Sequence, residues 1–72
     1  MRKYVIEYRM NRNGKVKSIE ILANNKIDAR AIALFEEIPS KEHDQPYSAW
    51  VASVIYNNGN QKEFNTFEGN PY

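Results

Sequence analysis

The chain has 72 residues, a formal net charge of +1 and no cysteine. This length holds one domain, and the lack of cysteine excludes disulfides and thiolate chemistry. No apolar run is long enough for a signal peptide or a membrane span, so we expect a cytoplasmic protein that does not use a membrane. We expect residues 1–72 to form a single domain in which residues 68–72 fray.

Residues 3–10 and 16–23 alternate apolar and polar side chains, which is the pattern of half-buried strands. Asn13-Gly14 lies between them and is a strong hairpin signal, because a two-residue type I′ turn needs positive φ at both positions. This turn places the apolar groups of both strands on one face. The predicted hairpin pairs Tyr8 with Ile19 and Ile6 with Ile21.

A helix is predicted after this hairpin. Asn25 can cap its N-terminus, and Asp28 follows at a position where a carboxylate is favourable. We expect Pro39 to end the helix, which leaves residues 39–47 as a polar loop. Its core-facing stripe is predicted from helical spacing as Ile27, Ala31, Leu34, Phe35 and Ile38. Truncation of a buried Phe35 to alanine is then expected to destabilise the fold by about 3–5 kcal/mol.

Residues 48–56 are rich in β-branched and aromatic side chains and predict a third strand. A turn over residues 57–60 leads to a weaker fourth strand over residues 62–67. The predicted fold is therefore α+β: an antiparallel four-stranded sheet with one helix on one face. The order along the chain is strand, strand, helix, strand, strand, and the order expected in space is second, first, third, fourth.

The third predicted strand carries apolar groups on both faces. By alternation, one face holds Trp50, Ala52, Val54 and Tyr56, and the other holds Val51 and Ile55. A single helix covers only one face of a sheet, and exposed apolar patches tend to mark interfaces. We predict a partner-binding surface on the uncovered face, centred on the pair Trp50 and Tyr56 or on the pair Val51 and Ile55. In the alternative, residues 39–47 or the C-terminal Phe67 and Tyr72 fold over that face.

The sequence holds no pattern typical of catalysis, of a metal site or of a cofactor. His43 is the only histidine and lies in the predicted loop, and the three glycines are isolated. A metal site would need converging ligands, and a phosphate-binding loop would need clustered glycines. We therefore predict no enzyme activity, no metal, no cofactor and no small-molecule substrate.

Charge is distributed unevenly along the chain. Residues 1–30 hold eight basic and three acidic side chains, whereas residues 31–72 hold two basic and six acidic ones. Four cations surround the first turn: Arg9, Arg12, Lys15 and Lys17. They could contact nucleic-acid phosphates or an acidic partner, or they could only keep the strand edges soluble.

The runs YVIEY at 4–8, NGK at 13–15, IEILAN at 19–24 and DARAIA at 28–33 resemble the opening of many very small phage and mobile-element proteins. Their layout is similar to that of compact β-β-α-β inhibitors, such as some anti-CRISPR proteins and phage antitoxins. The resemblance covers the first half of the chain and assigns no functional residue. It implies stoichiometric binding that blocks a host or defence protein.

The function predicted from these features is that of a non-enzymatic protein-binding module, of the phage-inhibitor type, that occludes a partner protein. A homodimer or an accessory subunit of a larger complex fits the same features. The alternative is a small nucleic-acid-binding protein that uses the basic tip of the first hairpin.

Overall fold

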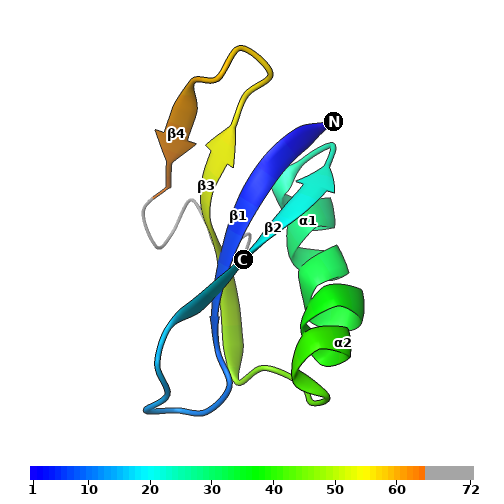
Figure 1. Ribbon diagram of the computed structural model, residues 1–72, viewed down its shortest axis with the longest axis vertical. Helices are drawn as coiled ribbons and strands as arrows, with labels where there is room; N and C mark the ends of the chain where they lie inside the picture. The colour runs from blue at the N-terminus through cyan, green and yellow to red at the C-terminus, as the bar shows by residue number, and fades with distance from the viewer. Residues whose placement is uncertain (65–72) are drawn as a thin grey trace.

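The computed structural model describes residues 1–64. Over this range the chain forms two strands, a helix built from three consecutive segments, and two further strands (Figure 1). The elements are β1 (Arg2–Arg9), β2 (Lys17–Ala23), α1 (Lys26–Ile32), η1 (Ala33–Glu37), α2 (Ile38–Glu42), β3 (Ser48–Ile55) and β4 (Gln61–Glu63). The predicted α+β class is confirmed.

In this part of the chain the strands form one antiparallel sheet in the order β2-β1-β3-β4. The order in space therefore differs from the order along the chain, and it is the order that keeps all neighbours antiparallel. The helix lies between β2 and β3 in the chain and packs on one face of the sheet (Figure 1). β4 is shorter than the strand predicted over residues 62–67, of which residues 65–67 lie outside the described range.

The first hairpin forms, but its predicted register is wrong by two residues. Ile6 pairs with Ile19, and Tyr8 pairs with Lys17. The turn spans residues 11–14, where the Gly14 amide donates to the carbonyl oxygen of Asn11 at 2.9 Å. Gly14 thus ends the turn and is not one of the described residues with positive φ. A shift of two residues leaves every side chain on its predicted face, because side chains alternate with a period of two.

The helix begins as predicted but presents a different face to the sheet. The Asn25 side chain accepts a hydrogen bond from the Asp28 amide at 2.8 Å, which caps α1. The residues buried against the sheet are Ala29, Ala33 and Ile38, each 0% exposed. Of the predicted stripe, Ile38 lies in the core and Leu34 packs against it, as predicted. Phe35 and Ile27 are 74% and 65% exposed, so this part of the stripe was assigned to the wrong side of the helix.

The helix also continues past the proline that was expected to end it. Pro39 lies in α2, which runs to Glu42. Immediately before it, η1 is a π-helical turn in which the Ile38 amide donates to the carbonyl oxygen of Ala33, five residues back. A proline inside a helix has no amide proton for the carbonyl four residues earlier, here that of Phe35, and its ring crowds that oxygen. The wider π turn accommodates this defect, as such bulges do.

The π turn explains which side chains face the sheet. Side chains four residues apart share a face in an α-helix, as Ala29 and Ala33 do. Ile38 follows Ala33 by five residues and would lie on another side of a regular helix. In the widened turn it returns to the buried face. The helix therefore buries two small alanines and one isoleucine, while Phe35 points to solvent.

β3 does not follow the simple alternation predicted for it. Val5 of β1 pairs with Ser53, but the next residue, Ile6, pairs with Val51, so Ala52 is an extra residue at a β-bulge. Beyond a bulge the faces of a strand exchange. Ala49 and Val51 before the bulge and Val54 after it are all buried beneath the helix.

The core is thus built from the helix-facing sides of β1 and β3, part of β2, and the face of the helix that carries Ala29, Ala33 and Ile38. Its buried apolar residues are Tyr4, Ile6, Tyr8, Ile21, Ala23, Ala29, Ala33, Ile38, Ala49, Val51 and Val54. The apolar side chains that alternate along the predicted first strand, Tyr4, Ile6 and Tyr8, all face the core.

We expect Ile38→Ala to lower the free energy of unfolding by about 2–5 kcal/mol, since it leaves a cavity at a fully buried site. Phe35→Ala is the matched control and should change it by less than about 1 kcal/mol, because the phenyl ring is mostly in water. Denaturant unfolding of both variants measures the difference. A larger loss for Phe35→Ala than for Ile38→Ala would contradict a helix orientation in which Ile38 faces the core and Phe35 faces solvent.

Candidate protein-binding surfaces

The four residues predicted to bind a partner do not share one surface. The sheet pairing places Trp50 and Ile55 on the face away from the helix, opposite Glu7 and Lys3 respectively. Val51 is 0% exposed in the core, so it cannot touch a partner while the protein is folded. Tyr56 is half-buried against the core at the other end of β3, with the Arg2 guanidinium 5.3 Å from its ring centroid. The predicted division of faces was wrong because of the bulge at Ala52.

Polar groups interrupt the apolar residues of the uncovered sheet face. The Trp50 indole donates to Glu7 Oε1 at 3.0 Å, and the Arg9 guanidinium lies 5.5 Å from the Trp50 ring centroid. Lys3 and Glu20 form an ion pair at 3.7 Å on the same face. Leu22 is the most exposed large apolar residue there, at 62%. The uncovered face is therefore a mixed surface in which Trp50 already has partners within the chain.

The segment 39–47 does not cover this face as one alternative expected. Residues 39–42 belong to the helix, and Glu42 contacts Tyr8 on the opposite side of the sheet. His43 ends the helix in a left-handed conformation, φ 61°, with its amide donating to the carbonyl oxygen of Pro39 at 2.9 Å. The alternative that Phe67 and Tyr72 cover the face concerns residues outside the described range.

The helix presents two large, exposed apolar side chains that were predicted to lie in the core. Ile27 is 65% exposed and Phe35 is 74% exposed. Asp28 and Glu36, the residues next to them, are also exposed. Ile38 of the same predicted stripe does lie in the core, so only the sides of Ile27 and Phe35 were predicted wrongly. Two signals could have corrected this error: the Ala29–Ala33 spacing, which suits close packing on a sheet, and Pro39 within the apolar pattern.

The four basic residues at the first hairpin are not an open cluster. Lys17 Nζ contacts Glu42 Oε1 at 2.9 Å, and Arg9 lies over Trp50. Arg12 and Lys15 are exposed at the tip itself. Two of the four predicted phosphate contacts are thus engaged within the chain, which does not favour nucleic-acid binding over the other interpretations.

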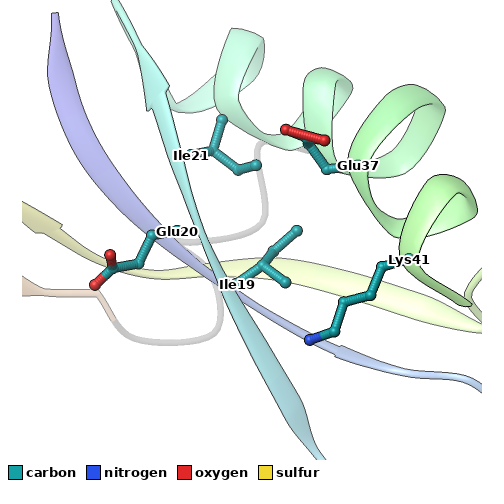
Figure 2. Close-up of a pocket in the computed structure, with 5 residues that line it drawn as sticks. All are labelled: Ile19, Glu20, Ile21, Glu37 and Lys41. Carbon is teal, nitrogen blue, oxygen red and sulfur yellow. The ribbon is translucent and has the colours of Figure 1, made fainter.

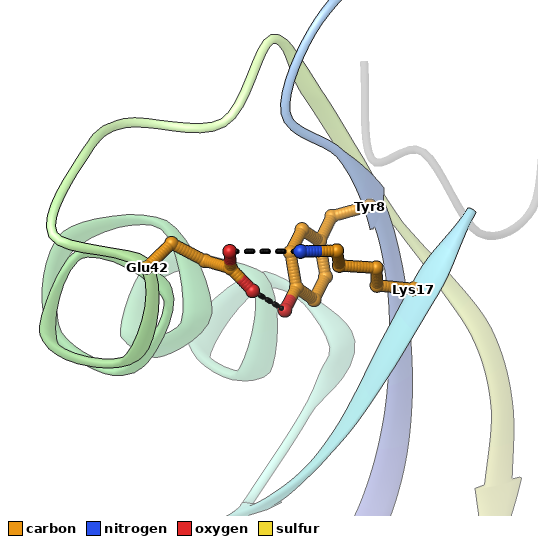
Figure 3. A network of polar contacts seen from close by, with 3 residues as sticks. All are labelled: Tyr8, Lys17 and Glu42. Atoms are coloured by element: carbon orange, nitrogen blue, oxygen red, sulfur yellow. Dashed lines mark hydrogen bonds and ion pairs between the residues drawn. The ribbon is translucent and has the colours of Figure 1, made fainter. Parts of the chain in front are cut away.

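A small polar network joins the hairpin to the end of the helix (Figure 3). The Tyr8 hydroxyl donates to Glu42 Oε2 at 2.7 Å, and Lys17 donates to the other carboxylate oxygen. Burial, together with Glu42, raises the pKa of Tyr8 to about 12. The hydrogen bonds from Tyr8 and then Lys17 lower the pKa of Glu42. Both shifts favour a neutral phenol and an ionised carboxylate, which suits a structural contact and leaves no base ready to accept a proton at neutral pH.

An open groove of about 230 Å³ lies between the edge strand β2 and the helix. Ile19 and Ile21 form its apolar floor, while Glu37 and Lys41 of the helix form its charged rim (Figure 2). The Glu20 side chain points away from the helix, to the other side of β2 (Figure 2). The groove is shallow and does not surround a small ligand.

Within residues 1–64, no group of three or more histidine, cysteine, aspartate or glutamate side chains could hold a metal ion. No helix in that range is long and apolar enough to cross a membrane. Comparisons with protein-family models, with curated protein sequences and with solved structures give no match.

We expect Glu42→Gln to remove a contribution to stability that is present at neutral pH and disappears in acid. Because the folded pKa of Glu42 lies below its ordinary value of 4.5, the ionised carboxylate stabilises the fold above about pH 4.5. That contribution is lost as the pH falls through the folded pKa. Denaturant midpoints measured from neutral pH downward should show a Glu42→Gln deficit that shrinks in acid. Glu36→Gln, which removes an exposed helix carboxylate, is the control; a deficit independent of pH would refute the network.

For Tyr8 the pH dependence of stability is opposite to that for Glu42, because its contribution is lost in alkali. Its folded pKa of about 12 exceeds the ordinary 10.0, so the neutral phenol stabilises the fold fully below pH 10 and loses this effect as the pH rises through 12. Wild-type stability should fall over this range more steeply than that of Tyr8→Phe. Tyrosinate absorbance gives the direct measurement, with Tyr47→Phe as an exposed control. A wild-type minus Tyr8→Phe titration centred near pH 10 would show that Tyr8 is not held as described.

Proposed function

We propose that this protein is a non-enzymatic protein-binding module whose main contact surface is the outer side of the helix. The observation that carries the proposal is Phe35, 74% exposed on a helix that also exposes Ile27. Large apolar side chains that remain exposed together tend to mark interaction sites. Aromatic residues are also frequent anchors of protein interfaces, where one side chain fills a pocket of the partner.

The helix supports this role better than the uncovered sheet face does. Trp50 on the sheet is half-buried, hydrogen-bonded to Glu7 and covered on one side by Arg9. Moving it into a partner's pocket would break these contacts. Phe35 has no such contact to lose, since most of its surface is already in water. Trp50 and Ile55 stay as the second surface to test.

The charges beside the apolar residues predict the chemistry of the partner. Glu36 and Glu37 directly follow Phe35, and all three residues are exposed. A complementary surface would hold an apolar pocket with basic groups at its rim, since opposite charges across an interface increase association rate and specificity. The resemblance to small phage-type inhibitors suggests a host or defence protein as the target, blocked by occlusion without any reaction.

The test is affinity capture from the native host with three immobilised proteins: wild type, Phe35→Glu, and the double variant Arg12→Glu/Lys15→Glu. A hot-spot phenylalanine is worth at least about 2 kcal/mol, so Phe35→Glu should bind the captured protein at least about 30-fold more weakly. The double variant should retain it. Unchanged capture by Phe35→Glu would overturn the proposed surface. Nuclease-sensitive capture that needs Arg12 and Lys15 would favour the nucleic-acid alternative.

A further inference from the structure

The outer edge of β2 is a strand edge with no neighbour among the described residues. β2 stands at the end of the sheet order and is seven residues long, more than twice the length of β4 at the other end. An edge of this length presents backbone groups that can pair with another strand. On the helix side of the sheet, the β2 edge borders the groove whose floor is formed by Ile19 and Ile21.

The direction of the free backbone groups follows from the neighbouring strand. The Tyr47 amide donates to the carbonyl oxygen of Arg9 at 2.8 Å, so the backbone of Arg9 faces β3. Alternation along β1 then turns the backbones of Tyr8 and Ile6 toward β2. Their partners Lys17 and Ile19 face β1 in return. The outward backbone groups of β2 consequently belong to its even-numbered residues: Ser18, Glu20 and Leu22.

We propose that the β2 edge pairs antiparallel with the β2 edge of a second copy of this chain, with the two-fold axis at Ile19. This register sets Ile19 against Ile19 and Lys17 against Ile21 on the helix side. On the other side it sets Ser18 against Glu20 and Val16 against Leu22. The last two are exposed apolar residues, at 41% and 62%, and each would gain an apolar neighbour.

The charged rim of the groove makes this pairing self-complementary. The helix runs antiparallel to β2, because Glu42 contacts Lys17 at one end while α1 begins next to the other. A two-fold axis at Ile19 therefore brings Glu37 of one copy beside Lys41 of the other, and the reverse pair forms by symmetry. If the two-fold axis lay one residue further along, at Glu20, Glu20 of one copy would lie opposite Glu20 of the other. Glu37 of one copy would then lie near Glu37 of the other. Like charges directly opposite are destabilising, so the Ile19 register is favoured.

This inference does not depend on the proposed function, because it uses a different surface. Phe35 does not line the groove. A dimer formed through β2 would carry two copies of the helix surface and could bind two sites on a partner. A single edge strand buries little area compared with a stable interface, so the dimer is expected to dissociate on dilution.

The absence of native cysteine allows a clean test by disulfide trapping. Ser18→Cys and Glu20→Cys are both on the exposed sheet face and do not disturb the core. The proposed register predicts that a mixture of the two variants forms a disulfide-linked heterodimer at least about tenfold faster than either variant alone, because directly opposite Cβ atoms lie about 5 Å apart. An axis at Glu20 would instead set Ser18 opposite Leu22, so faster linkage of Ser18→Cys with Leu22→Cys, which keeps both Glu20 side chains, would overturn the Ile19 register.

Light scattering of the unmodified protein between about 10 µM and about 1 mM gives the second readout, since a weak dimer must appear in this range. The mass should rise from 8.4 kDa toward twice that value. Glu20→Pro, which removes an outward amide, should stay monomeric, whereas Glu20→Ala and Phe35→Glu should dimerise like the wild type. A mass of one chain at every concentration, or a dimer that Glu20→Pro leaves intact, would overturn the proposal.

Discussion

A proline inside the helix is the constraint on which most of this structure depends. Pro39 cannot bond to the carbonyl of Phe35, and the chain responds with the π turn over Ala33–Glu37. That turn returns Ile38 to the core and leaves Phe35 in solvent. The helix can then continue to Glu42, which reaches the hairpin through Tyr8 and Lys17. The core, the polar network and the exposed aromatic surface therefore follow from the same backbone defect.

The outer surfaces of the domain differ in how far their apolar side chains already make contacts within the chain. On the uncovered sheet face, Trp50 is held by Glu7 and Arg9, and a charged pair stands between the apolar residues. On the helix, Phe35 extends into water. At the β2 edge, what remains open is backbone, next to an apolar groove with charges of both signs at its rim. The exposed Phe35 side chain can fill a pocket in another protein, whereas the open β2 edge can pair with another strand.

The sequence patterns predicted the strands, the Asn25 cap and the inner face of β1, because these depend on local chemistry and on a period of two. They could not detect the hairpin register, since a two-residue slip leaves the faces unchanged. They failed where one residue changes the period: the π turn reversed the side assigned to Phe35, and the bulge at Ala52 moved Val51 into the core. Each predicted partner-binding pair therefore joins one residue of the uncovered face, Trp50 or Ile55, to one that packs in or against the core, Tyr56 or Val51.

The place of β1 has a consequence for how the chain is made. Among the described strands β1 is synthesised before the others, yet it lies inside the sheet and pairs with both β2 and β3, with Lys3 opposite Ile55. On the ribosome the hairpin can close early, but the second edge of β1 stays open until almost all of the described chain has emerged. Closing so long a loop is entropically slow, and an open edge can recruit a neighbouring nascent chain. Crowded polysomes are therefore where this small protein is most exposed to misassembly.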